Sequence, residues 1–114
     1  MSGFVYLITE RDNEKYYKIG CTKKQDIEER RKELQTGNSS ELQIIHHFNT
    51  SEPYKLEKML HQFYANKNKI NEWYELSNEE VLNFLEVCKN YQNIIESLKD
   101  NPFFNKNKRG DVLI

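Results

Sequence analysis

Two aromatic and β-branched stretches near the N-terminus, with a polar turn between them, constrain the fold of this chain more than any other feature. Residues 3–9 read GFVYLIT and residues 15–20 read KYYKIG. The residues between them, ERDNE, have the polarity and the length of a hairpin loop. The sequence therefore predicts an antiparallel pair of strands at the start of the fold.

A charged helix is predicted directly after this hairpin. Asp26, with Glu29 three residues later, matches a capping box, in which the first side chain accepts from the helix N-terminus and the second reaches back to it. The helix is expected to end near Gln35, because Thr36-Gly37 begins a turn-forming stretch.

The rest of the chain continues to alternate strands with helices. We predict a strand over 42–49, a helix from Pro53 to about Ala65, a polar loop over 65–71, a strand over 72–76 and, after a second capping box (Ser77 to Glu80), a helix to about Leu98. The order β-β-α-β-α-β-α indicates an α+β fold, with a small, mostly antiparallel sheet flanked by helices. Residues 1–98 would form one domain. Residues 99–114 would be a tail that docks through Phe103 and Phe104, mediates self-association or begins a linker.

Composition restricts the classes of function. A net charge of −1 means that any nucleic-acid contact must come from a local basic patch and not from a broadly positive surface. The sequence contains no run of about 18 apolar residues and no signal-peptide pattern, so we expect an intracellular protein, cytoplasmic or nuclear, without a membrane partner. Cys21 and Cys88 match no zinc-ligand spacing and are expected to be free thiols. The oligomeric state is left open.

Strand alternation places candidate reactive groups on one side of the hairpin. Tyr17 and Ile19 share the face expected to meet the core, and Lys18 points to the other face. Tyr6 of the first strand can face Lys18, and a neighbouring cation would depress the pKa of its phenol. The alternative is that both are ordinary exposed side chains of a hairpin.

These residues, taken in order, resemble a known family. GFVYLI, then YYKIG, then a helix carrying Arg30 are similar to the GIY-YIG nuclease superfamily, and more closely to its branch with KIG as second motif, a phage-derived DNA-binding or endonuclease-like domain. The resemblance runs from Gly3 to about Leu76, through DIEERRKEL, LEKMLHQF and EWYEL. It implies a DNA endonuclease, of mobile-element or phage type, that hydrolyses phosphodiester bonds with one Mg²⁺ or Mn²⁺ ion.

The resemblance assigns catalytic roles to four residues. Tyr6 and Lys18 would assist the attacking water. Arg30 would stabilise the phosphate, and Glu57 would hold the metal. Lys18 stands where the best-known members have a tyrosine, and Leu34 where they have a histidine. These departures keep open a DNA-binding module of the same fold with little or no activity, and a purely structural interaction domain is a third reading.

Basic side chains near these positions are candidates for DNA contacts. The candidates are Lys23, Lys24, Arg31, Lys32 and His61. Glutamates interleave with the lysines and arginine, so a solvated face fits equally well. His61 lies one helical turn after Glu57 and is also compatible with packing or with support of that carboxylate. Four further rings are expected to be structural, with base stacking as the alternative for the last two: His46, His47, Trp73 and Tyr74.

Arg30 and Arg31 are adjacent on the first predicted helix, so only one of them can face the sheet. Arg30 shares a stripe with Ile27 and Leu34, so its stem is expected to be buried on the sheet and its guanidinium to face the hairpin. Arg31 points about 100° away around the helix and is expected to be more exposed.

Overall fold

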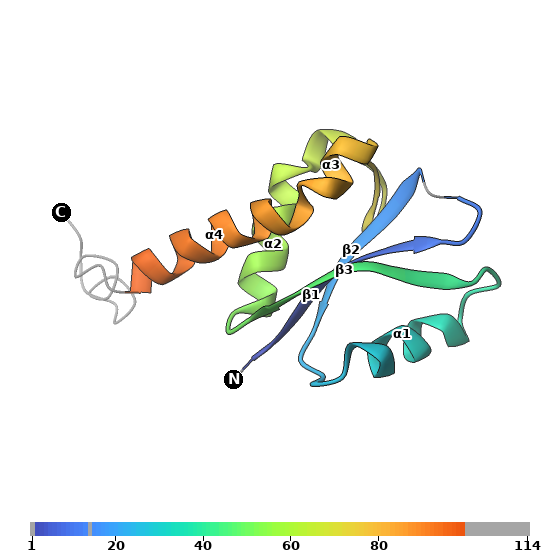
Figure 1. Cartoon of the computed structure of the whole chain (residues 1–114), viewed down its shortest axis with the longest axis horizontal. Helices are drawn as coiled ribbons and strands as arrows, with labels where there is room; N and C mark the ends of the chain where they lie inside the picture. Colours follow the sequence, from blue (N-terminus) through green and yellow to red (C-terminus); the bar gives the residue numbers. More distant parts are fainter. Residues whose placement is uncertain (1, 14, 100–114) are drawn as a thin grey trace.

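The computed structural model describes residues 2–13 and 15–99. Its elements are β1 (Gly3–Glu10), β2 (Tyr16–Thr22), α1 (Ile27–Thr36), β3 (Leu42–Thr50), α2 (Pro53–Phe63), the 3₁₀ turn η1 (Ala65–Lys67), β4 (Asn68–Ile70), β5 (Trp73–Glu75), α3 (Asn78–Leu82) and α4 (Phe84–Lys99) (Figure 1). The predicted anchor at Phe103 and Phe104 lies outside the described residues.

The strands form one open, antiparallel sheet in the order β3-β1-β2-β5-β4. The predicted hairpin is its centre, because β1 pairs with β2 along one edge and with β3 along the other. In the β1–β2 register, Tyr6 lies opposite Gly20 and Ile8 lies opposite Lys18. The predicted α+β class, with a small antiparallel sheet flanked by helices, is confirmed.

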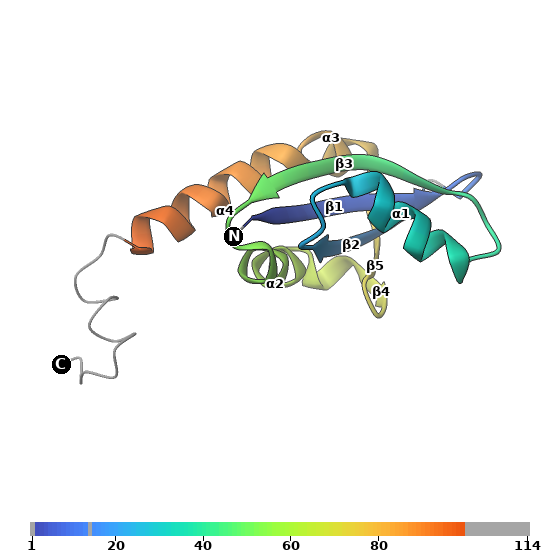
Figure 2. The same cartoon turned by 90° about the horizontal axis from the view of Figure 1, so that it is seen from below.

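Helices cover both faces of the sheet, with α1 on one side and α2 and α4 on the other (Figure 1, Figure 2). Tyr17 and Ile19 belong to the larger core cluster, which α2 and α4 close, so the predicted alternation is confirmed. Tyr6 and Ile8 belong to a smaller cluster on the opposite face, packed beneath Ile27 and Leu34 of α1. None of the ten residues of α1, all of them described, is fully buried.

Two elements differ from the prediction. The stretch expected to be a polar loop contains β4, which pairs with β5 although its three residues are exposed and show no apolar alternation. Its turn is made by Asn71, which adopts a positive φ of 50°, and by the Asn68 amide, which donates to the carbonyl oxygen of Asn71. The last helix is divided at Asn83, the C-cap of α3.

The two predicted capping boxes have different outcomes. Ser77 and Glu80 form both reciprocal bonds at the start of α3. Asp26 caps α1 by accepting from the backbone N–H of Glu28, but Glu29 does not complete a box. The Glu29 carboxylate instead lies 3.7 Å from the Lys24 ammonium, an ion pair that competes for the same side chain.

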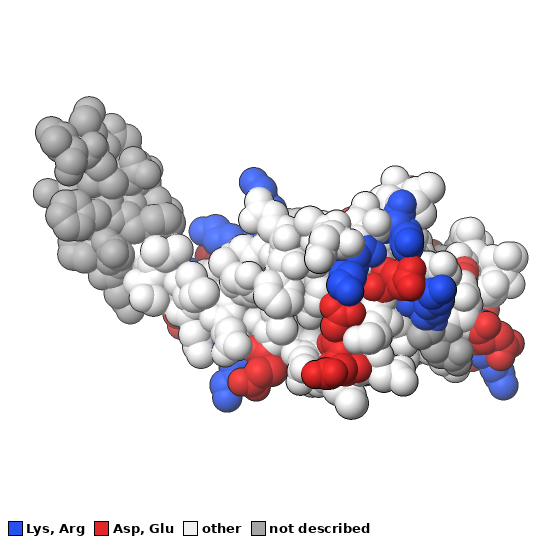
Figure 3. Space-filling view, turned by 90° about the horizontal axis from the view of Figure 1, so that it is seen from above, with Lys and Arg blue, Asp and Glu red and all other residues white. Residues whose placement is uncertain are grey.

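Three further features were predicted from composition: the state of the cysteines, the absence of a membrane-spanning helix and the distribution of charge. Cys21 and Cys88 are free thiols, as predicted. Among residues 2–13 and 15–99, none of the helices combines the length and the apolarity that crossing a membrane requires. In the view of Figure 3, positive and negative side chains lie close together and much of the surface carries no charge, so this face has no broad basic patch.

The glycine at position 20 leaves room for the Tyr6 ring. A Cβ added there would lie 2.5 Å from the Tyr6 hydroxyl oxygen and 2.7 Å from its Cζ. We predict that Gly20→Ala destabilises the fold by about 1–3 kcal/mol, the usual cost of overpacking a core, as measured by urea unfolding. Gly37→Ala is the matched control, because a Cβ at Gly37 meets nothing within 4 Å and its φ is −98°.

The same pair of positions provides a double-mutant test. In a Tyr6→Leu background the aromatic ring is gone, so Gly20→Ala should cost much less than in wild type. An equal cost in both backgrounds would show that the ring is not what excludes a side chain at Gly20.

Candidate active site at the open edge of strand β2

The phenol of Tyr6 lies between the sheet and α1. Its side chain is fully buried, and its hydroxyl accepts a hydrogen bond from Nε of Arg30 at 3.3 Å. Arg30 also donates from a terminal nitrogen to Glu33, 3.1 Å away. The contact between Tyr6 and Arg30 requires the helix register that places Arg30 on the stripe of Ile27 and Leu34.

The pKa of Tyr6 is raised above its ordinary value of 10. Burial is the largest cause; the hydrogen bond and charge of Arg30 oppose it only in part. The expectation that Lys18 would depress this pKa is wrong. The Lys18 ammonium lies 3.7 Å from a carboxylate oxygen of Glu72, and Arg30 is the cation in contact with the phenol.

Strand β2 has an open edge beyond Lys18, because β5 pairs only with Tyr16, Tyr17 and Lys18. Two groups bind the backbone of Ile19 just past that point. Its N–H donates to the carbonyl oxygen of Glu72 at 3.1 Å, and its own carbonyl oxygen lies 2.9 Å from Nε2 of His61. This one residue therefore holds both the turn before β5 and the helix α2 against the open edge.

An acidic group gathers at this edge. Ligand atoms of Glu57, His61 and Glu72 all lie within 4.8 Å of one another. Burial, and then the charge of Glu72, raises the pKa of the Glu57 carboxyl. The thiol of Cys21 is hydrogen-bonded to Glu57, and burial together with that carboxylate raises the pKa of Cys21 to about 12, so the thiol keeps its proton.

The donor set fits a divalent cation. Two carboxylates and an imidazole suit Mn²⁺ and related ions, and the carboxylates suit Mg²⁺. Nε2 of His61 is engaged by a backbone carbonyl and its ring stacks on Tyr74, at 5.6 Å between centroids. Such a bond fixes the ring and leaves Nδ1 as the nitrogen with a free lone pair, the usual arrangement of a ligating histidine.

The expectation that the four residues with predicted catalytic roles converge on one face of the sheet is wrong. Tyr6 and Lys18 lie on the face covered by α1, whereas Glu57 comes from α2 on the other face. Arg30 influences the pKa of both Tyr6 and Glu57. The charge of Glu72 raises the pKa of these two groups, whereas the charge of Arg30 lowers it. The candidate site therefore lies at the open edge of β2, where groups from the two faces of the sheet are close enough to affect one another's pKa.

The predicted DNA-contacting side chains have mixed surroundings. Lys24 pairs with Glu29 and Glu33, and Lys23 lies over the Tyr54 ring at 5.1 Å from its centroid. Lys32 is exposed. His61 is engaged with Ile19, as described above.

The expectation that Arg31 is the more exposed arginine is wrong. Its side chain is 24% exposed, against 32% for Arg30. Helix α1 also contacts β3, so the side of the helix that carries Arg31 faces a strand and a hollow lined by Leu42 and Ile44. Nε of Arg31 donates to Glu28 at 3.0 Å.

Two contributors to the site had no distinct sequence signal. Glu72 is one of many glutamates in a chain that is 31% charged, and Cys21 follows the second motif without any partner nearby in the sequence. Both are found only from the backbone that brings them to Ile19 and Glu57. Two of the remaining rings have the expected structural role: Tyr74 is buried, and His46 stacks on Phe84 and lies 2.9 Å from the carbonyl oxygen of Val81.

The comparison with protein families adds one match. The family model of the T5orf172 domain covers residues 3–89. The chain belongs to the T5orf172 domain family. No curated protein and no solved structure gives a significant match. The matched region of this T5orf172 domain contains every residue of the site described above.

The acidic group makes a prediction about stability. In metal-free protein at pH 7, we expect Glu57→Gln to raise the melting temperature by a few degrees. The raised pKa of Glu57 means that folding disfavours its charged form, so the destabilisation develops as pH rises from the ordinary carboxyl pKa through the raised one. Added Mn²⁺ should raise the melting temperature of wild type but not of Glu57→Gln.

Glu86→Gln is the control for this experiment, because it removes an exposed carboxylate from α4. It should respond to Mn²⁺ as wild type does. A wild-type protein whose melting temperature does not change in millimolar Mn²⁺ or Mg²⁺ would contradict the assignment of a cation site.

Proposed function

We propose that this T5orf172 domain is a divalent-metal-dependent DNA endonuclease that hydrolyses phosphodiester bonds. The observation that carries the proposal is the contact between the Tyr6 phenol and the Arg30 guanidinium beside the group of Glu57, His61 and Glu72. The likeness of GFVYLI and YYKIG to the motifs of the GIY-YIG nucleases supports it, because that likeness selects Tyr6, Arg30 and Glu57 independently of the geometry.

Arg30 and Lys18 supply positive charge for the phosphate. A guanidinium has five N–H donors, and Arg30 uses two of its nitrogens to bind Tyr6 and Glu33. Its partly exposed head can direct the remaining donors to non-bridging phosphate oxygens. The Lys18 side chain is 25% exposed and adds a second charge.

Glu57, His61 and Glu72 would hold the metal ion. When bound, Mg²⁺ or Mn²⁺ supplies charge neutralisation at the phosphate and polarises its P–O bonds. The three side chains are fixed by separate contacts: Glu57 by the Cys21 thiol, His61 by the Ile19 carbonyl, and Glu72 by Lys18. The ligands would therefore be held in place before an ion arrives.

Tyr6 is the proposed acceptor of the proton from the attacking water, which would require the side chains that cover its hydroxyl to move, because Tyr6 is fully buried. At neutral pH the phenol carries its own proton, so only the ionised fraction can act as a base. That fraction is small, but each phenolate is a strong base beside Arg30, which stabilises its charge. The departing oxygen would take its proton from solvent.

The proposal is tested with supercoiled plasmid in Mg²⁺ or Mn²⁺. Wild type should nick the plasmid. Glu57→Ala should abolish nicking while its circular dichroism stays that of a folded protein, because the variant lacks one of the proposed metal ligands. Glu86→Ala should nick as wild type does. Retention of the plasmid in a gel shift without any nicking would contradict the proposal and favour a DNA-binding module without activity.

The arginine pair provides a matched control within the same assay. Arg30→Ala should lower turnover by at least about a hundredfold, the scale of losing one preorganised donor to the transition state. Arg31→Ala removes an equal charge from the same helix but no contact with Tyr6, so it should mainly weaken binding. The reverse pattern would assign the phosphate contact to Arg31.

The raised pKa of Tyr6 predicts the pH dependence. If its phenolate is the base, the cleavage rate should rise about tenfold per pH unit from pH 7 to pH 9 without reaching a plateau, because the ionised fraction grows tenfold per unit below the pKa. Tyr6→Phe should remove this slope along with most of the rate. A plateau below pH 9 in wild type would assign the proton transfer to another group.

A further inference from the structure

The face of the sheet that carries Tyr6 and Lys18 also carries a hollow that the proposed chemistry does not use. It has a volume of about 380 Å³ and lies between the tip of the β1–β2 hairpin, the end of α1 and the β4–β5 hairpin. Its apolar lining comes from Tyr16, Trp73 and Ile70. Its polar lining includes Glu10, Asn13 and Asn38.

Trp73 connects this hollow to the candidate active site. It lies directly opposite Lys18 in the β2–β5 register, and opposed residues of an antiparallel pair share a face of the sheet. One part of its side chain packs on the cluster of Tyr6 and Ile8, and another part lines the hollow. The ring is therefore held in place by the core and is available to a ligand.

The chemistry of the lining is that of a site for a flat, polar heterocycle. Two aromatic rings offer stacking surfaces, and Ile70 is 63% exposed at the rim. The amides of Asn13 and Asn38 and the carboxylate of Glu10 provide donors and acceptors around the edge. The Asn38 amide already donates to Glu10 at 3.0 Å, which orients both groups.

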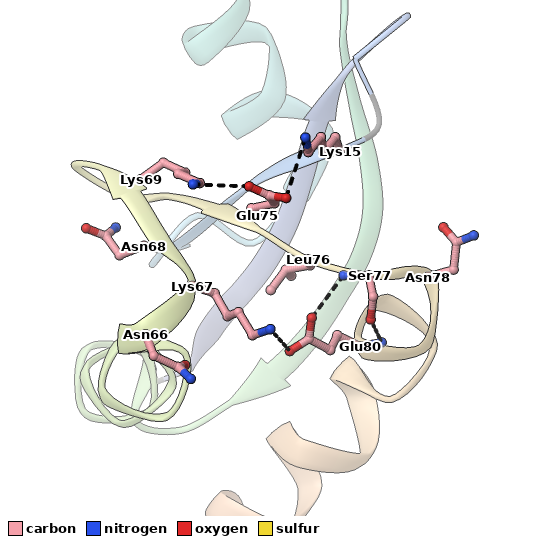
Figure 4. A pocket seen from close by; sticks show the side chains of 10 residues that line it. All are labelled: Lys15, Asn66, Lys67, Asn68, Lys69, Glu75, Leu76, Ser77, Asn78 and Glu80. Atoms are coloured by element: carbon pink, nitrogen blue, oxygen red, sulfur yellow. Dashed lines mark hydrogen bonds and ion pairs between the residues drawn. The ribbon is translucent and has the colours of Figure 1, made fainter.

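The distance to the phosphate-binding groups suits one nucleotide. Tyr16 and Lys18 are two residues apart on the same face of β2, which is roughly 7 Å along a strand. A base stacked on Trp73 or Tyr16 would place its attached sugar toward Lys18 and its phosphate toward Lys18 and Arg30. Another hollow, lined by residues of β4 and by Glu75 and about 630 Å³ in volume, includes neither Lys18 nor Arg30 in its lining (Figure 4).

That hollow is lined mainly by charged and amide side chains, together with Leu76 and Ser77, and its described residues include no aromatic ring. Lys15 and Lys69 point to Glu75, and Lys67 points to Glu80 (Figure 4). Its lysines are thus paired within the protein, and no ring is present on which a base could stack.

We propose that the hollow of Tyr16, Trp73 and Ile70 binds an unpaired DNA base next to the phosphate held by Arg30 and Lys18. The placement of that phosphate rests on the proposed function. The inference adds a substrate preference, because a base must leave the duplex stack to enter the hollow. The domain would then favour single-stranded or branched DNA over an intact duplex.

Trp73 is the one tryptophan of the chain, so its fluorescence reports on this hollow directly. In the presence of a chelator, which prevents cleavage, we expect a single-stranded oligothymidylate to quench the fluorescence in a saturable way. An oligomer with the same number of phosphates but abasic sugars should bind without comparable quenching. A duplex of equal length should quench weakly. Equal quenching by the abasic oligomer would overturn the proposal.

A variant pair measures the energy of the contact. Tyr16→Leu should weaken binding of the oligothymidylate by about tenfold or more, the effect of losing one base-stacking ring. Phe63→Leu is the matched control, because Phe63 is an exposed ring on α2 that does not line the hollow, and it should bind as wild type does. Unchanged affinity in folded Tyr16→Leu would overturn the proposal.

The two proposals fail separately. Plasmid nicking without quenching of Trp73 by single strands would leave the endonuclease and remove the base site. Quenching that depends on bases, in a protein that never nicks DNA, would leave the base site and remove the endonuclease.

Discussion

A tyrosine buried between a glycine and an arginine is the constraint on which the rest of the structure depends. The Tyr6 ring takes the space that a side chain at Gly20 would fill, and its hydroxyl is bonded to Arg30. A buried hydroxyl without a partner would cost about 1–3 kcal/mol, so this bond fixes the register of α1 on the sheet. The strand register and the helix register are thereby coupled through one phenol.

The second organising feature is an imbalance of charge at the open edge of β2. Two carboxylates, Glu57 and Glu72, lie close together, and the charge of Glu72 helps burial to raise the pKa of Glu57. Lys18 and Arg30 compensate in part, but both lie toward the α1 side of the sheet. Negative charge therefore gathers on the α2 side of this region, whereas Arg30 is already paired with Glu33. The proposed metal ion would neutralise the carboxylates on the α2 side.

The sequence predicts the elements that depend on local pattern. The hairpin, the Pro53 helix start and the Ser77 capping box all follow from residues close together in the chain, and the structure contains each of them. Strand β4 was missed because all three of its residues are exposed, so burial leaves no pattern in its sequence. The division at Asn83 was missed because the apolar positions continue across it at helical spacing.

The site is harder to predict because it depends on where β5 stops pairing. Ile19 becomes available to Glu72 and His61 only because the β2–β5 ladder ends at Lys18. No pattern within residues 15–20 specifies that endpoint. The relative exposure of Arg30 and Arg31 depends in the same way on tertiary packing, because β3 begins soon after α1 in the chain and packs beside it. Motif likeness identified residues that the structure brings together, while tertiary pairing determined their partners and their charges.

The weak attachment of α1 has a consequence for the energy landscape of the protein. Its ten residues include none that is fully buried, and its apolar contact with the sheet is limited to a small cluster around Ile27 and Leu34. Local opening is expected first where few apolar contacts resist it, so α1 should detach in a sub-global event well below the free energy of complete unfolding. Each such event would carry Arg30 away from Tyr6 while Glu57 stays in place on the other face. Conditions that loosen this helix would therefore dismantle half of the site long before the fold is lost.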